Sequence, residues 1–188
     1  MSISAVLLAG GESRRMGQDK ATVIFRGKRL WQRQLDVLRK LKPAELLISA
    51  RLDPGWRPGD TIFVADVSPS RGPLSGLCAA LAQMKSTHLL ALAIDMPFMH
   101  DVYLRSLCDQ IKPGRGVLPM IAGRAEPLGA IFPSEAQPQF EAALSGVEFS
   151  LQRLTRELVQ ADRLMMISVA QADESLFCNI NEPTGLTQ

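Results

Sequence analysis

Short, uniformly apolar runs alternate along this chain with segments in which apolar residues recur at helical spacing. The run Leu89–Ile94 is apolar throughout, which is typical of a buried strand in a sheet that is covered on both faces. The segment Leu30–Leu41 instead places four leucines roughly on one side of a helix, and Pro43 marks its end. The pattern therefore predicts strands and helices in alternation.

The same two patterns assign the remaining elements. We expect further strands over Ile3–Ala9, Glu45–Ala50, Thr61–Ala65, Val117–Ile121, Leu128–Phe132 and Leu164–Val169. We expect further helices over Leu74–Met84, His100–Ile111, Ser134–Leu144 and Ser150–Val159. This alternation favours an α/β fold, a three-layer sandwich with an open, mostly parallel, Rossmann-like sheet. A chain of 188 residues suits a single domain over residues 1–188.

The first strand ends in a turn that is suited to bind an anion. Gly10 and Gly11 follow the strand, and three cations come within the next ten positions, at Arg14, Arg15 and Lys20. Glycines let the backbone approach a ligand closely, and the exposed N–H groups of such a turn form an anion-binding concavity. The cations beyond it favour a polyphosphate, so we expect a nucleotide. The alternative is a glycine-rich turn with solvated arginines.

This turn differs from both common phosphate-binding loops. A Walker A loop requires Gly-Lys-Ser/Thr at its end, whereas Gly17 is followed here by Gln18, Asp19 and Lys20. The G-x-G-x-x-G spacing of a dinucleotide-binding fold is also absent after the first strand. The nucleotide is therefore expected in another kind of site at the carboxyl ends of the strands.

A second candidate residue follows the most apolar strand. Asp95 comes directly after Leu89–Ile94, at the edge of the sheet where ligands of open α/β folds bind. A carboxylate that faces a triphosphate needs a counter-charge, and Mg²⁺ is commonly held by one or two carboxylates plus phosphate oxygens. The alternative is that Asp95 caps the next helix, with Pro97 in its first turn.

Composition and charge narrow the partners. The net charge of +2 is too small to favour a nucleic acid. The three cysteines are far apart and form no C-x-x-C pair, which argues against structural zinc and a disulfide framework. No apolar run approaches the roughly 20 residues of a membrane span, and the N-terminus lacks the features of a signal peptide. We expect a cytoplasmic protein without a membrane partner.

The segment Leu8–Lys20, LAGGESRRMGQDK, resembles the signature LAGGxSRRMGxDK of the nucleotidyltransferases that modify the molybdenum cofactor. It is most similar to the guanylyltransferases among them, and the likeness runs from residue 5 to about residue 186. The resemblance implies a fold like that of the nucleotide-diphospho-sugar transferases. It also implies that GMP is transferred from GTP to molybdopterin, with pyrophosphate as the other product. Related cytidylyltransferases carry alanine at the position of Gly10, where a methyl group would crowd a purine.

The resemblance also implies roles for individual residues. Arg14, Arg15 and Lys20 would be catalytic and contact the triphosphate, and Asp95 would be catalytic and bind Mg²⁺. Asn179 and Asn181, in a stretch similar to the family's NINTP, would face the molybdopterin. Asp66 would contact the nucleotide, and Ser49 stands where the family often has an asparagine that touches the guanine. The remaining nucleotide contacts would come from the end of the first strand, at Leu8, Ala9, Gly10 and Gly11.

Alternatives to these roles and to this activity stay open from the sequence. Asp66, Asn179 and Asn181 are also typical turn residues, and Ser49 can be purely structural. An enzyme of the same fold could transfer a cytidylyl group to molybdopterin or to a sugar or isoprenoid phosphate. A non-catalytic nucleotide-binding module could instead deliver the cofactor to molybdoenzymes or work with other cofactor-biosynthesis proteins.

Overall fold

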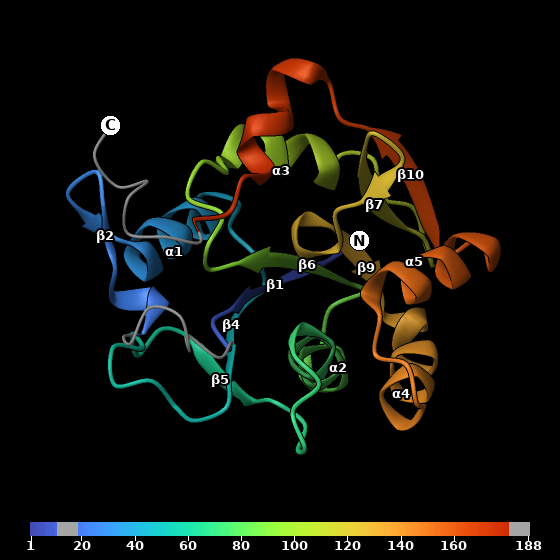
Figure 1. Cartoon of the computed structure of the whole chain (residues 1–188), viewed down its shortest axis with the longest axis horizontal. Helices are drawn as coiled ribbons and strands as arrows, with labels where there is room; N and C mark the ends of the chain where they lie inside the picture. The colour runs from blue at the N-terminus through green and yellow to red at the C-terminus, as the bar shows by residue number, and fades with distance from the viewer. Residues whose placement is uncertain (11–18, 181–188) are drawn as a thin grey trace.

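A central mixed sheet organises the molecule (Figure 1). The computed structural model describes residues 1–10 and 19–180. Along the sheet the strand order is β10-β7-β9-β6-β1-β4-β5, and the short β8 pairs with β7. The strands are β1 (Ile3–Leu8), β4 (Glu45–Ala50), β5 (Ile62–Ala65), β6 (His88–Ala93), β7 (Gly116–Ile121), β8 (Arg124–Ala125), β9 (Ile131–Pro133) and β10 (Leu164–Ser168).

Most of the pairs in this sheet are parallel, as the sequence predicts. Strand β1 lies between β4 and β6 and is parallel to both, so Leu8 is level with Ser49 and Ala93. Strand β9 is the exception along the path, because it runs antiparallel to β6 and β7. The carboxyl ends of β1, β4 and β6 therefore meet at one edge of the sheet.

Helices cover both faces and complete three layers. Alternate strand residues point to opposite faces, so Ala5 and Leu7 of β1 pack in one apolar cluster and Val6 and Leu8 in the other. The first cluster includes α1 (Leu30–Lys40), α3 (Asp101–Cys108) and the 3₁₀ segment η4 (Gln171–Phe177). The second includes α2 (Pro73–Gln83), α4 (Gln137–Ser145) and α5 (Leu151–Gln160). The α/β sandwich with an open, mostly parallel sheet is confirmed.

Two connecting regions differ from the sequence pattern. The expected strand Leu128–Phe132 begins instead as the 3₁₀ turn η2 (Pro127–Gly129), and β9 starts only at Ile131. Proline has no N–H for a strand ladder. Gly129 packs so closely on η4 that an added Cβ would lie 2.8 Å from the Phe177 ring. The expected helix from Ser134 likewise opens as the 3₁₀ turn η3 (Ser134–Ala136) before α4.

The connection between β1 and α1 contains three short elements that the sequence pattern does not reveal. They are η1 (Lys20–Thr22) and a small hairpin of β2 (Ile24–Phe25) and β3 (Lys28–Arg29). In residues 1–10 and 19–180 no helix has both the length and the apolar character that crossing a membrane requires.

Candidate functional site

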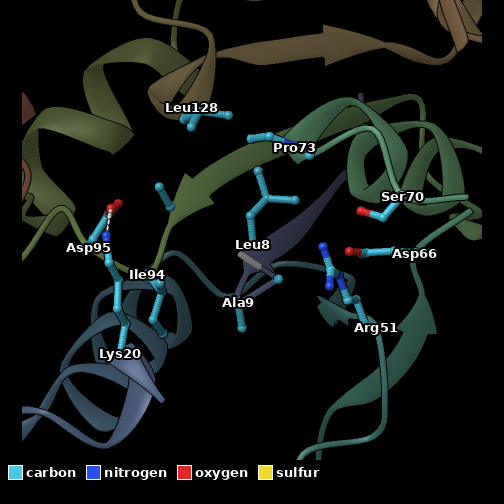
Figure 2. Close-up of a pocket in the computed structure, with 13 residues that line it drawn as sticks. Leu8, Ala9, Lys20, Arg51, Asp66, Ser70, Pro73, Ile94, Asp95 and Leu128 are labelled. Carbon is cyan, nitrogen blue, oxygen red and sulfur yellow. Dashed lines mark hydrogen bonds and ion pairs between the residues drawn. The ribbon is translucent and has the colours of Figure 1, made fainter. Parts of the chain in front are cut away.

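A cavity of about 550 Å³ opens at the carboxyl edge of the sheet (Figure 2). It lies where β1, β4 and β6 end, the place where open α/β sheets bind ligands. Its walls come from segments that are far apart in the sequence: Leu8, Ala9, Gly10, Lys20, Arg51, Asp66, Ser70, Gly72, Pro73, Ala93, Ile94, Asp95 and Leu128.

The wall at the end of β1 is made by closely packed backbone. Ala9 and Gly10 both donate their N–H groups to the carbonyl oxygen of Ser49, at 2.9 and 3.1 Å. An added Cβ on Gly10 would lie only 2.5 Å from Oδ2 of Asp66. Glycine at this position therefore leaves room for the carboxylate of Asp66 beside the turn.

The carboxylate of Asp66 is held from behind. Ser49 donates its hydroxyl hydrogen to Oδ1 of Asp66 at 2.5 Å, and only 1% of Ser49 is exposed. Gly76 of α2 packs against the same pair, because its added Cβ would collide with Oγ of Ser49 and lie 3.2 Å from Oδ1 of Asp66. Ser49 thus serves as support for Asp66 and does not line the cavity itself.

An ion pair marks the other side of the cavity. Nζ of Lys20 lies 3.0 Å from Oδ2 of Asp95, and the two side chains keep 26% and 19% of their surface exposed. Figure 2 shows the two groups facing each other from η1 and from the end of β6. Because both groups are partly exposed, the lysine can release the carboxylate to bind a phosphate, and the freed carboxylate can bind a metal ion.

Asp19 fixes the segment that carries Lys20. Its Oδ1 accepts the N–H of Ala21, which caps η1, and its Oδ2 accepts the indole N–H of Trp56 at 3.0 Å. Trp56 is stacked on Trp31 with ring centroids 5.4 Å apart. The loop after β4 therefore anchors the start of η1.

A buried glutamine of α1 holds the backbone around Asp95. Nε2 of Gln34 donates to the carbonyl oxygens of Ala93 and Met96, at 3.3 and 2.6 Å. The carbonyl of Asp95 itself accepts the N–H of Ile180 at 3.0 Å. These bonds fix the turn after β6, so that the carboxylate of Asp95 points into the cavity.

Replacement of Gln34 by leucine is expected to lower the free energy of unfolding by about 2 kcal/mol, because two buried carbonyl groups lose their donor. Urea unfolding followed by circular dichroism measures this change. The control is the exposed Gln83→Leu, which should stay within about 0.5 kcal/mol of the unmodified chain. Equal stability of both variants would contradict the supporting role of Gln34.

The roof of the cavity contains Leu128 of η2. Burial raises the pKa of the neighbouring Glu126 above its ordinary value, and the charge of Arg124 partly offsets this rise.

Across the cavity, α2 begins at Pro73, after Gly72, whose φ of 65° is a backbone angle that favours glycine.

Comparison with known proteins identifies the family. Residues 5–163 match the MobA-like NTP transferase domain. The chain belongs to this family. A relative from Opitutus terrae named "Probable molybdenum cofactor guanylyltransferase" is 33% identical over 185 residues, covering 97% of this chain and 92% of the relative. The "Molybdenum cofactor guanylyltransferase" of Xanthomonas euvesicatoria is 28% identical over 181 residues, covering 96% and 90%.

Solved structures agree with this family. Molybdopterin-guanine dinucleotide biosynthesis protein A from Archaeoglobus fulgidus has a TM-score of 0.77 and 25% identity, with coverage of 97% of this chain and 94% of that one. A 4-diphosphocytidyl-2C-methyl-D-erythritol synthase from Anaerococcus prevotii has a TM-score of 0.75 at 14% identity, with coverage of 98% and 92%. The second likeness concerns the fold alone.

The cavity of this MobA-like domain gathers most of the singled-out residues that the structure describes. Those that line it are Leu8, Ala9, Gly10, Lys20, Asp66 and Asp95. Asn179 is exposed and is not among the lining residues, although its neighbour Ile180 bonds to the turn at Asp95. Gly11, Arg14, Arg15 and Asn181 lie outside the described residues, so their roles stay predictions.

Several residues of the site could not be singled out from the sequence alone. Arg51 and Ser70 line the cavity, and Gln34 and Trp56 support it from behind. Arg51 offered one weak signal, because it stands two residues after Ser49 and alternate residues of an extended chain share a face. Gln34 and Trp56 gave no comparable signal, since each acts through a contact that only the folded chain creates.

Proposed function

We propose that this chain transfers GMP from GTP to molybdopterin, forming molybdopterin guanine dinucleotide and pyrophosphate. The proposal extends to this chain the activity that the names of its relatives carry. The single observation that supports it best is the pairing of Lys20 with Asp95, 3.0 Å apart, at the edge of the cavity. A cation for phosphate oxygens and a carboxylate for a divalent ion are the two groups that a metal–nucleotide complex requires.

We further propose that Asp95 holds Mg²⁺. In the part of the chain that the structure describes, no three His, Cys, Asp or Glu side chains form a ready metal cage. One carboxylate is nevertheless sufficient for Mg²⁺, because this ion is commonly bound by one or two carboxylates together with substrate phosphates. When bound, Mg²⁺ would neutralise charge on the phosphate oxygens. The partly exposed carboxylate of Asp95 suits that role.

The protein's own contribution is alignment and charge. Lys20 would leave Asp95 for the phosphates and stabilise the negative charge of the departing pyrophosphate. Arg14 and Arg15 are predicted to assist it. A terminal phosphate oxygen of molybdopterin attacks the α-phosphorus of GTP, and the bond to the β-phosphate oxygen breaks. The attacking group is already an anion, so the reaction needs no general base.

The direct test supplies purified chain with GTP, Mg²⁺ and molybdopterin and detects the dinucleotide by its mass. We expect this product and one equivalent of pyrophosphate, with CTP as a much poorer donor. GTP binding without pyrophosphate release would support a cofactor-delivering module instead. Efficient turnover of CTP would support cytidylyl transfer.

Gly10→Ala tests whether the base lies beside the end of β1. The added methyl group has no room beside Oδ2 of Asp66, so the carboxylate must move. We expect kcat/KM for GTP to fall about tenfold or more relative to that for CTP, the size of one lost charged hydrogen bond. Steady-state kinetics with both nucleotides measure it. Gly59→Ala is the control, because nothing lies within 4 Å of its added Cβ. Unchanged selectivity in Gly10→Ala would mean that the base is read elsewhere.

A further inference from the structure

We propose that Arg51 determines the base specificity of this site, together with Asp66. The inference rests on the proposed function and deepens it. Arg51 would donate two hydrogen bonds to O6 and N7 of guanine, while Asp66 would accept hydrogen bonds from the N1–H and the 2-amino group.

The placement of Arg51 is the first support. It comes directly after β4 and lines the main cavity together with Asp66 and Ser70. The same three residues also line an adjoining hollow of about 330 Å³ with Val67 and Ser68. Arg51 therefore stands where the main cavity adjoins the second hollow.

The two ends of the cavity each carry one cation and one carboxylate, but the two carboxylates have different partners. Figure 2 shows Arg51, Asp66 and Ser70 on one side, with Lys20 and Asp95 on the other. Asp95 is paired with Lys20 and is the proposed ligand of the divalent ion that accompanies a triphosphate, whereas Asp66 is held by the hydroxyl of Ser49 and would repel the phosphates. The phosphates therefore suit the Lys20 end, and the Arg51 end suits a neutral group with both donors and acceptors.

The support behind Asp66 sets which hydrogen bonds it can make. Oδ1 already accepts the hydroxyl hydrogen of Ser49, and the glycines at positions 10 and 76 leave space around the carboxylate. The charged carboxylate can only accept hydrogen bonds. Guanine presents two adjacent donors, N1–H and the 2-amino group, and an acceptor of this kind matches them. Adenine has an unprotonated N1, so it offers the carboxylate no donor at that position.

The guanidinium of Arg51 complements the other edge of the base. Its planar fork of N–H donors matches the paired acceptors O6 and N7 of guanine, the same bidentate geometry by which arginine reads guanine in DNA. Adenine places an amino group at position 6, where it would meet a donor. Ser49 gives its hydroxyl hydrogen to Asp66, whereas Arg51, two residues further on, lines the cavity with its guanidinium donors.

The test removes single atoms from the nucleotide. 7-Deaza-GTP lacks the N7 acceptor, and inosine triphosphate lacks the 2-amino group. For the unmodified chain we expect each analogue to bind about tenfold more weakly than GTP in calorimetric titrations with Mg²⁺, the cost of one hydrogen bond to a charged group. The same titrations on Arg51→Lys, which keeps the charge but loses the fork, should show GTP and 7-deaza-GTP within about twofold. Inosine triphosphate should still bind about tenfold more weakly than GTP to that variant, because Asp66 is intact.

The outcomes distinguish the inference from the proposed function. Equal binding of GTP and 7-deaza-GTP by the unmodified chain would overturn the role of Arg51 while leaving guanylyl transfer intact. A tenfold preference for GTP over 7-deaza-GTP that persists in Arg51→Lys would overturn the role of Arg51 as well. Failure of the unmodified chain to bind GTP at all would overturn the proposed function and the inference together. Arg156→Lys, exposed on α5, is the matched control and should behave like the unmodified chain.

Discussion

Asp95→Asn is expected to reduce guanylyl transfer by about 10³-fold, the upper range for loss of one preorganised charge-stabilising group. The substitution preserves the size of the side chain but removes the negative charge that would hold Mg²⁺. The turn itself should remain in place, because Gln34 and Ile180 hold its backbone carbonyls independently of the carboxylate. A magnesium titration of the initial rate measures the effect, and the variant should show no saturation in the range where the unmodified chain saturates.

Asp60→Asn provides the comparison for this variant. Asp60 is also a carboxylate in an ion pair, with Arg39 at 2.8 Å, but it lies on the exposed loop before β5 and does not line the cavity. The activity and magnesium dependence of Asp60→Asn should match those of the unmodified chain. A magnesium titration of Asp95→Asn that is indistinguishable from that of the unmodified chain would exclude Asp95 as a ligand.

Lys20→Ala is expected to lower kcat by about 10²-fold or more, because the leaving pyrophosphate loses a preorganised cation. The ammonium group is held at the cavity by the capping of η1 through Asp19, so it is already in place when the phosphates bind. Single-turnover measurements with saturating GTP separate this effect on the chemical step from any weakening of nucleotide binding.

Lys28→Ala is the matched variant for Lys20. Lys28 lies on the β2–β3 hairpin, outside the cavity, and pairs with Asp36 of α1. Removal of the Lys28 side chain should leave kcat unchanged. Thermal unfolding of both variants checks that neither loses its fold. A near-normal kcat in Lys20→Ala would show that this lysine has no part in stabilising the leaving group.

Hydrophobic patterning was sufficient for the architecture because a sheet covered on both faces needs continuous apolar strands. The run at β6 is buried along its whole length, and the leucines of α1 face the sheet. The pattern failed where tertiary contacts decide the local structure. Leu128 belongs to a 3₁₀ turn because Pro127 cannot join a ladder and Gly129 packs against Phe177. The two-residue strands β2 and β3 are too short to show any period.

The site could be predicted where its residues lie within two positions of the end of a strand. Gly10, Asp66 and Asp95 each stand at such a position, and parallel strands bring these positions to one edge. The orientation of Ser49 could not be predicted, because its hydroxyl hydrogen has a partner 17 positions away in the sequence. Arg51 could not be ranked above other exposed arginines until the fold placed it beside Asp66.

The central claim is that the cavity binds a magnesium–GTP complex between Lys20 and Asp95 on one side and Asp66 on the other. Isothermal titration calorimetry of GTP, with and without Mg²⁺, tests it most directly. We predict saturable heat of binding that is stronger with Mg²⁺, and loss of this magnesium effect in Asp95→Asn. The absence of heat for GTP and for every other nucleoside triphosphate, with Mg²⁺ supplied, would contradict the claim.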